Sequence, residues 1–169
     1  MAGPPHPTHR FPYMVSYPTH FPFTMTTTAS TLAENYQVSI SNGRHTLLAD
    51  EPFHAGGGDT GPNPYDLLLA SLAACTAITV QMYAQRKQWP LERVNLSLSR
   101  RQVLAKDCPD CTSDPNSKVE MITVEVSFEG NLTSEQIDRL LDISGRCPVH
   151  RSLIGEIKIN TQLAAKNNG

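Results

Sequence analysis

The sequence predicts an α+β fold, and three observations support this assignment. Segments in which apolar and polar residues alternate, as in half-buried β-strands, occur both before and after one long apolar helical segment. Two further segments with helix-start signals follow the longest alternating run. The resulting order is strands, helix, strands, helices and strand, without the strict strand–helix–strand repeat of a parallel sheet. Helices packed on antiparallel strands are therefore expected.

The beginning of the 169-residue chain differs in composition from the rest. Residues 1–24 hold 6 of the 13 prolines and 3 of the 6 histidines, with no leucine and no acidic residue. Such a segment can neither form a helix nor bury a periodic apolar face. We predict a disordered Pro/His-rich tail over 1–30 and a single domain over 31–165. An alternative is that Met25 is the natural start and that the preceding residues are an upstream extension.

The first elements expected after the tail are a hairpin and a long helix. Residues 36–40 and 44–48 are strand-like and flank Asn42-Gly43, a dipeptide typical of a type I′ turn. After a Gly-rich loop, Asn63 can cap a helix that has Pro64 at its first position and runs to about Lys87. This helix is apolar on nearly all sides, so it must be surrounded by protein, as at a subunit interface.

The second half of the chain predicts two strands, two helices and a last strand. Residues 94–98 and 122–128 alternate as strands on either side of a polar loop over about 105–118. Thr133 and Gln136 form a capping-box pattern at the start of a helix that ends near Gly145. Cys147-Pro148 starts the next helix, because proline is favoured at the first helical position. Ile157 and Ile159 begin the final strand.

Charge and length exclude several classes of function. The chain has 14 Lys and Arg against 16 Asp and Glu, and no basic cluster, so nucleic-acid binding is not expected. The longest apolar stretch, residues 67–80, is shorter than the roughly 20 residues that cross a bilayer, so no membrane partner is expected. Four cysteines are too few for a disulfide scaffold and no secretion signal opens the chain. We therefore expect a cytoplasmic protein.

The cysteines are the candidate reactive residues. Spacing alone makes Cys75, inside the apolar helix, a small core residue. Cys147 precedes Pro148 at a helix start, beside unpaired backbone N–H groups and near Arg146, His150 and Arg151. Each of these features favours the thiolate over the thiol.

The remaining cysteines leave a metal site open as an alternative. Cys108 and Cys111, together with Cys147 and His150, offer three sulfurs and one imidazole, as structural zinc requires. The long stretch between Cys111 and Cys147 is unlike a compact zinc knuckle. For Cys108 and Cys111 alone, we favour a loop with an incidental or reversible disulfide over a catalytic role.

Two motifs carry a resemblance to a known family. Residues 57–76 (GGDTGPNPYDLLLASLAACT) and 146–151 (RCPVHR) resemble the OsmC/Ohr family of thiol peroxidases, and the similarity extends over about residues 36–163. The resemblance implies an intertwined α+β homodimer, with central helices packed against antiparallel-rich sheets and active sites at the subunit interface. It implies no cofactor. The tail has no counterpart in the family.

The resemblance also implies a mechanism and its residues. Cys75 matches the peroxidatic cysteine, which reduces an organic hydroperoxide, and hydrogen peroxide less readily, in defence against oxidative stress. Cys147 matches the resolving cysteine, and the implied reductant is a dithiol such as a lipoylated protein. The family stabilises its thiolate with an arginine from an N-terminal strand, for which Arg44 is the candidate.

The acidic partner of that arginine departs from the family pattern. The family places a glutamate ten residues before the cysteine, where this chain has Tyr65, and Asp66 stands nine residues before it. Nine residues at about 100° each put Asp66 on the helix face opposite Cys75. We keep Asp66 as the candidate, and as the competing hypothesis a non-enzymatic zinc-stabilised or small-ligand-binding domain that retains the fold.

Overall fold

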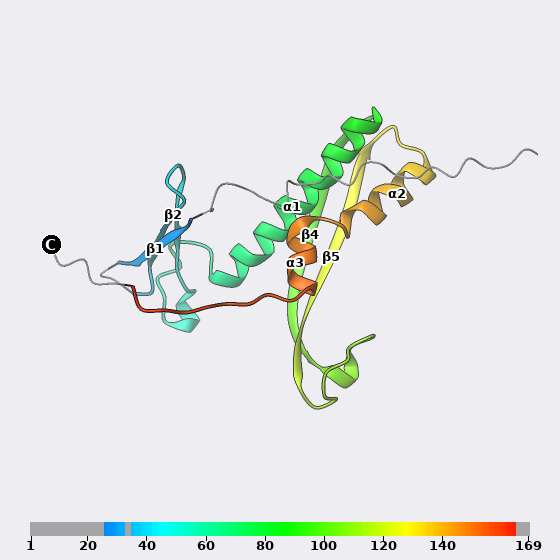
Figure 1. Cartoon of the computed structure of the whole chain (residues 1–169). Helices are drawn as coiled ribbons and strands as arrows, with labels where there is room; N and C mark the ends of the chain where they lie inside the picture. The colour runs from blue at the N-terminus through cyan, green and yellow to red at the C-terminus, as the bar shows by residue number, and fades with distance from the viewer. Residues whose placement is uncertain (1–25, 33–34, 165–169) are drawn as a thin grey trace, which may run out of the picture. The chain divides into compact units, whose positions relative to one another are not determined.

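The computed structural model describes residues 26–32 and 35–164, which belong to two compact units divided between Gly61 and Pro62. Each unit has its own sheet, and Figure 1 labels the main elements of both. The predicted tail falls largely outside the described residues. The first strand begins at Thr28, inside the range 1–30 assigned to that tail. The single domain predicted for 31–165 stays a prediction.

The first unit is built on a three-stranded antiparallel sheet. Its strands, in the order β1-β2-β3, are β1 (Thr28–Thr31), β2 (Val38–Ser41) and β3 (Thr46–Ala49). A short 3₁₀ helix, η1 (Phe53–Ala55), follows. The hairpin expected around Asn42-Gly43 is therefore confirmed.

The type of turn in this hairpin was predicted wrongly. Ser41 pairs with Thr46, which leaves a four-residue loop, and a type I′ turn requires positive φ at both central residues. Gly43 has φ +86°, but Asn42 is not among the described residues with positive φ. Instead, the Asn42 side-chain oxygen accepts hydrogen bonds from the backbone N–H groups of Arg44 and His45, at 3.1 and 2.9 Å. The asparagine stabilises the loop through its side chain.

Asp50 organises the Gly-rich loop that ends the first unit. Its buried carboxylate accepts hydrogen bonds from the N–H groups of Glu51, Gly58 and Thr60 and from the Thr60 hydroxyl, at 2.8 to 3.2 Å. Burial by itself would raise the pKa of Asp50, but these hydrogen bonds outweigh it and hold the pKa below its usual value. At Gly57, a Cβ atom would lie 1.8 Å from the Glu51 carbonyl oxygen, so the loop requires glycine there.

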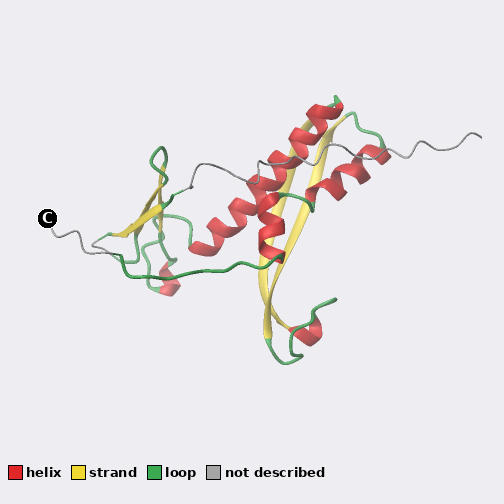
Figure 2. Cartoon of the chain, in the orientation of Figure 1, coloured by secondary structure: helices red, strands yellow, loops and turns green. Residues whose placement is uncertain are grey.

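The second unit packs helices on a two-stranded antiparallel sheet. In chain order its elements are α1 (Pro64–Lys87), β4 (Leu91–Leu104), the 3₁₀ helix η2 (Ala105–Asp107), β5 (Lys118–Gly130), α2 (Ser134–Ser144) and α3 (Pro148–Ile154). Figure 2 shows the three α-helices grouped beside the two long strands. α1 contacts β4, α2 and α3, so it is the central helix of the unit, as predicted. The α+β fold class is confirmed.

The start of α1 has the expected cap. The Asn63 side chain accepts hydrogen bonds from the N–H groups of Tyr65 and Asp66, and the Asp66 carboxylate accepts one from the Asn63 N–H at 3.1 Å. The helix ends at Lys87, where Gln88 adopts a left-handed conformation. Both predicted boundaries are thus confirmed.

We expect Asn63→Ala to lower the free energy of unfolding by about 1 kcal/mol, because the first turn loses its side-chain acceptor. Chemical denaturation followed by circular dichroism measures this change. Asn63→Asp is the matched control, because aspartate caps equally well and should keep the original stability. An alanine variant as stable as the aspartate variant would contradict the role of the cap.

The β4–β5 sheet presents one apolar face to the helices. Val94 pairs with Phe128, Leu96 with Val126, and Leu98 with Val124, and all six are half-buried. The residues between them, such as Ser97 and Glu125, are exposed. This alternation confirms the two predicted strands. The core lies between this face and the helices; it is centred on Val80, Ala84, Leu140 and Ile143, with Tyr83, Trp89, Leu91, Val94, Phe128 and Leu132 packed around it.

α1 is not fully covered within this unit, and the subunit interface expected to cover the rest of it stays a prediction. Its buried residues, Leu72, Thr76, Val80 and Ala84, recur every four positions and form one stripe. On other sides, Ile78 is 56% and Met82 41% exposed. The helix is also long and apolar enough to span a membrane by length and composition, a test that core helices pass as well.

The final strand predicted at Ile157 and Ile159 is absent from the described residues. Residues 156–164 have no regular secondary structure, and Ile159 is 85% exposed. A strand forms only where a neighbouring strand offers its backbone N–H and C=O groups. No described strand pairs with this segment, so its alternating sequence alone does not make it a strand.

Candidate active site

The structure brings Cys75 and Cys147 together. Cys75 lies half-buried in the middle of α1, and Cys147 is fully buried at the start of α3. Their two thiols interact through a side-chain hydrogen bond. Neither cysteine is in a disulfide here, so the site holds two adjacent thiols.

Helix α3 supplies backbone N–H groups to both sulfurs. Cys147 caps α3, and its Sγ accepts a hydrogen bond from the N–H of His150 at 3.3 Å. The N–H of Val149, one residue earlier in the same turn, bonds to Cys75. The start of a helix has N–H groups without intrahelical partners, and here they point at the sulfurs. The helix start predicted at Cys147-Pro148 is confirmed.

Two threonines of α1 complete the polar surroundings of the thiols. Thr76, which is only 2% exposed, donates its hydroxyl to the Cys147 Sγ at 3.4 Å. Thr79 donates its hydroxyl to the Cys75 carbonyl oxygen at 2.7 Å and also interacts with the Cys75 side chain. Thr76 was not among the site residues predicted from the sequence. The available signal was a hydroxyl beside Cys75 in an otherwise apolar helix, and a buried hydroxyl needs a hydrogen-bonding partner.

The surroundings of Cys75 favour its protonated form. Burial raises the pKa of Cys75, and the neighbouring Cys147 raises it further, while the Val149 N–H and the Thr79 hydroxyl act in the opposite direction. The groups that shift this pKa within the described residues include no cation. A fast nucleophile at neutral pH would therefore need a cation in addition to these contacts.

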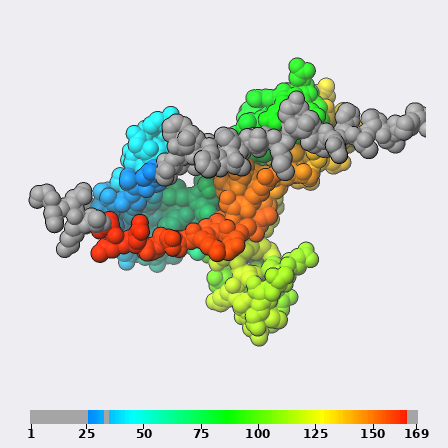
Figure 3. All heavy atoms as spheres, viewed as in Figure 1, coloured from blue at the N-terminus to red at the C-terminus, as the bar shows by residue number. Residues whose placement is uncertain are grey.

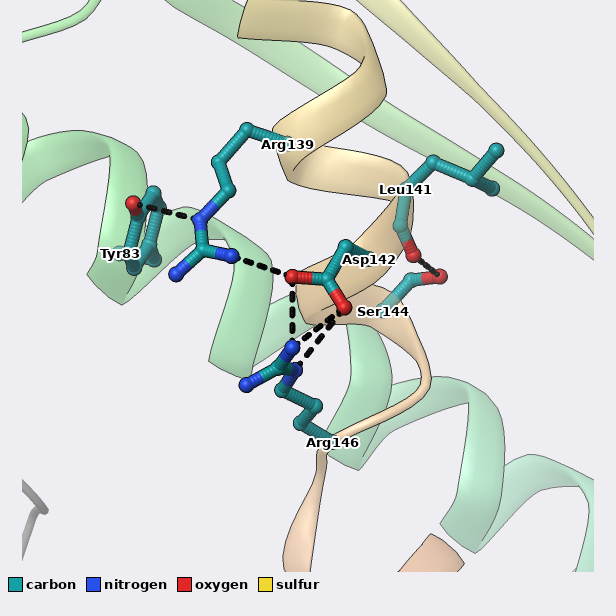
Figure 4. A network of polar contacts seen from close by, with 6 residues as sticks. All are labelled: Tyr83, Arg139, Leu141, Asp142, Ser144 and Arg146. Atoms are coloured by element: carbon teal, nitrogen blue, oxygen red, sulfur yellow. Dashed lines mark hydrogen bonds and ion pairs between the residues drawn. The ribbon is translucent and has the colours of Figure 1, made fainter.

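Arg146, beside Cys147 in sequence, is bound to a carboxylate. Its guanidinium contacts the two Asp142 oxygens at 2.6 and 2.8 Å, and Arg139 bonds to the same carboxylate and to the Tyr83 hydroxyl (Figure 4). The Arg146–Asp142 pair spans the last turn of α2 and the residue before Cys147. This network fixes the connection between α2 and α3. It also makes Arg146 a poor candidate for a thiolate partner.

The other two predicted site residues are not joined to the cysteines by any described contact. Arg44 lies exposed in the β2–β3 loop of the first unit. Asp66 lies in the first turn of α1, where its carboxylate is used in the helix cap. Their roles stay predictions.

Tyr65, where the resemblance expects a glutamate, takes part in a different interaction. The Arg100 guanidinium lies over the Tyr65 ring, 3.4 Å from its centre. Glu120 holds Arg100 through an ion pair of 2.8 Å, and the pKa of Glu120 is lowered by it. Arg100 on β4 was not singled out by the sequence analysis, because the stacking depends on the packing of β4 against α1.

The alternative zinc site is not assembled in the described structure. Cys108 and Cys111 are joined by a disulfide, whereas Cys147 is buried beside Cys75. Among residues 26–32 and 35–164, no group of three or more His, Cys, Asp or Glu side chains could hold a metal ion. The disulfide agrees with the interpretation favoured for Cys108 and Cys111 taken alone.

Comparison with protein families gives one match. A family model described as OsmC-like protein matches residues 56–162, which is more than half of the chain and includes both Cys75 and Cys147. The comparison with curated proteins finds no match.

Solved structures share the fold at low sequence identity. An OsmC-like protein from Mycoplasma pneumoniae has a TM-score of 0.61 at 20% identity, over 79% of this chain and 89% of that one. The organic hydroperoxide resistance protein OsmC of Legionella pneumophila gives 0.57 at 19% identity, over 79% and 90%. An organic hydroperoxide resistance protein from Elizabethkingia anophelis gives 0.58 at 19%, over 80% and 91%. At these identities the likeness establishes the fold alone.

Proposed function

Because the chain belongs to the OsmC-like family, we propose that it is a thiol-dependent peroxidase that reduces organic hydroperoxides, and hydrogen peroxide less readily. The observation that carries this proposal is the contact between the Cys75 and Cys147 thiols. Two of the structures similar in fold are named organic hydroperoxide resistance proteins, which supports a stress-related role. The proposed setting is the cytoplasm, where thiols stay reduced.

The chemistry proceeds in two steps at adjacent sulfurs. The Cys75 thiolate attacks the terminal oxygen of the hydroperoxide; an S–O bond forms, the O–O bond breaks, and the alkoxide takes a proton and leaves as an alcohol. Cys75 is then a sulfenic acid. The Cys147 sulfur attacks it, an S–S bond forms and hydroxide leaves as water after protonation. A dithiol reduces this disulfide by two exchange steps and is itself oxidised to a disulfide.

The contacts around the thiols suit these two steps. The Val149 N–H bonds to Cys75 and favours its charged form. The Thr76 hydroxyl and the His150 N–H donate hydrogen bonds to the Cys147 sulfur and hold it in place. Because the two sulfurs already interact, the second step requires little movement of the chain. The sulfenic acid should therefore be short-lived in the intact protein.

The proposal is tested by the products of oxidation. We expect one equivalent of cumene hydroperoxide to convert the reduced protein to a Cys75–Cys147 disulfide, and Cys147→Ser to stop at a Cys75 sulfenic acid or to overoxidise. Peptide mapping by mass spectrometry identifies both products. If mapping finds only Cys108 and Cys111 linked and Cys75 still free, the peroxidase proposal fails. The alternative, a non-enzymatic small-ligand-binding domain, would then be favoured.

We propose that Arg44 supplies Cys75 with a cation, which the described groups that shift the pKa of this thiol do not include. Burial raises the Cys75 pKa, so the thiolate forms only as the pH rises above the usual thiol range. A guanidinium stays charged at any relevant pH and would oppose this shift. We expect Arg44→Ala to move the pH dependence of Cys75 alkylation to higher pH and to slow peroxide reduction at least about tenfold, or about 1.4 kcal/mol.

Peptide-resolved alkylation with iodoacetamide across pH measures this effect. Arg93→Ala is the matched control, because Arg93 is an exposed strand residue whose ion pair with Glu129 is 3.7 Å long. Its profile should equal that of the unmodified protein, with the circular dichroism of both variants unchanged. If the pH profiles of Cys75 alkylation are identical for Arg44→Ala and Arg93→Ala, Arg44 is an ordinary hairpin residue. Arg151 is then the next candidate for the cation.

A further inference from the structure

The loop between β4 and β5 carries a second pair of cysteines, in a disulfide. Cys108 and Cys111 are bonded to each other, with their Cα atoms 5.6 Å apart. Backbone hydrogen bonds from Ala105 to Ser117 and from Lys106 to Pro115 hold the base of the loop, at 2.9 and 3.1 Å. Figure 3 shows this loop, in yellow-green, projecting from the end of the two strands and away from the helices of the same unit. The disulfide thus lies at the tip of the hairpin.

This disulfide contributes little to the stability of the hairpin. A disulfide stabilises a protein mainly by restricting the unfolded chain, and the effect is smallest for the shortest closed loops. Here only two residues separate the cysteines. The hairpin itself is closed by strand pairing from Leu104 and Lys118 to Arg93 and Glu129, and after a register shift Leu91 pairs with Gly130. The bond is therefore not needed to hold β4 and β5 together.

The tip disulfide lies in a largely exposed part of the chain. Cys108 and Cys111 are half-buried, and the two residues between them, Pro109 and Asp110, are exposed. Cys147, by contrast, is fully buried. Thiol–disulfide exchange requires a thiolate to reach one sulfur in line with the S–S bond, so accessible disulfides are the ones that exchange.

From this placement we infer that Cys108 and Cys111 form a second dithiol–disulfide couple, which exchanges with small neutral dithiols independently of Cys75 and Cys147. Cys75 and Cys147 interact with each other, so neither is the partner of the tip cysteines. Asp107, Asp110 and Asp114 lie in the tip loop, against Lys106 in the loop and Lys118 at its base. Any dithiol attacks as a thiolate, and negative charge on the loop slows the approach of a dithiol that also carries a carboxylate more than one that does not.

The exchange is balanced without any other reactant. A thiolate of the external dithiol forms an S–S bond with one tip sulfur, and the Cys108–Cys111 bond breaks with the other sulfur leaving as thiolate. The second thiolate of the dithiol then displaces the first tip sulfur. The tip gains two electrons and takes up the two protons lost by the dithiol, which becomes a disulfide. Oxidation by a disulfide in solution is the reverse.

The full-length Cys75→Ser/Cys147→Ser variant isolates this couple, because only the tip cysteines remain. We expect buffers of reduced and oxidised dithiothreitol to convert the pair reversibly, as counted by alkylation and mass spectrometry, without loss of circular dichroism. At low ionic strength, neutral dihydrolipoamide should reduce the tip several-fold faster than the anionic dihydrolipoate. In the Cys108→Ser/Cys111→Ser variant, no alkylation of the loop is expected, which shows that the alkylation counted there comes from this pair.

Two results would overturn the inference. In the first, the native protein keeps the tip disulfide in millimolar dithiothreitol and loses it only in denaturant, so the disulfide is inert to exchange. The other is reduction accompanied by loss of strand signal, which would make it a structural bond. Equal rates with dihydrolipoamide and dihydrolipoate would refute the selectivity for neutral dithiols. Because the variant tested lacks Cys75 and Cys147, none of these results depends on peroxidase activity.

Discussion

Replacing Cys75 by serine is expected to abolish turnover of organic hydroperoxides. A hydroxyl in place of the thiol has no accessible anion at neutral pH and forms no sulfenic acid, so the first step is lost. We expect the rate to fall at least about a thousandfold, equivalent to about 4 kcal/mol in the barrier. Consumption of cumene or tert-butyl hydroperoxide with excess dithiol measures it.

Two variants identify which sulfur attacks. Cys147→Ser should consume one equivalent of hydroperoxide and then stall or overoxidise, because the attacking thiol remains but its neighbour does not. Cys108→Ser/Cys111→Ser should turn over like the unmodified protein. If Cys147→Ser loses even the first equivalent while Cys75→Ser keeps it, the attacking thiol is Cys147. Its hydrogen bonds from Thr76 and His150 would then be the basis of its reactivity.

Local sequence signals predicted the elements whose causes are local. Asn63 and Pro64 mark the start of α1 because the cap and the proline act within one turn. The alternation over residues 122–128 predicts β5 because one face of this part of the strand is half-buried and the other is exposed. Ile157 and Ile159 alternate in the same way, yet they form no described strand, because pairing depends on a partner that the local sequence does not specify.

The two cysteines of the candidate site could be predicted from the sequence, but the groups that contact them could not. The position of Cys147 before Pro148 indicates a helix start with free N–H groups, and the structure confirms that geometry. That Val149 bonds to Cys75 and Thr76 to Cys147 depends on how α3 packs against α1, which spacing within either helix does not encode. Arg146 shows the converse. Arg146 lies just after the end of α2, four residues from Asp142, and the ion pair between them is a local competitor for any role at the thiol.

The exposed apolar side of α1 leads to the second large effect, on assembly. Ile78 and Met82 on α1 and Leu141 on α2 are each at least 41% exposed in the described structure. Apolar side chains gathered on a central helix are stabilised when a partner removes them from water. We propose that a second copy of the chain does so, and light scattering at micromolar concentration should give twice the chain mass.

Ile78→Arg is expected to weaken this dimer by about 3 to 5 kcal/mol, on the order of a hundredfold or more in dissociation constant, because an unpaired guanidinium would be buried in the contact. Ser97→Arg is the matched control, since Ser97 is exposed on the face of β4 opposite the one that packs on the helices. Sedimentation of both variants across concentration measures the difference. If the unmodified protein is a folded monomer, the proposed dimer is contradicted. In that case any cation that acts on Cys75 comes from the same chain, and Arg44→Ala in the monomer tests whether Arg44 is that cation.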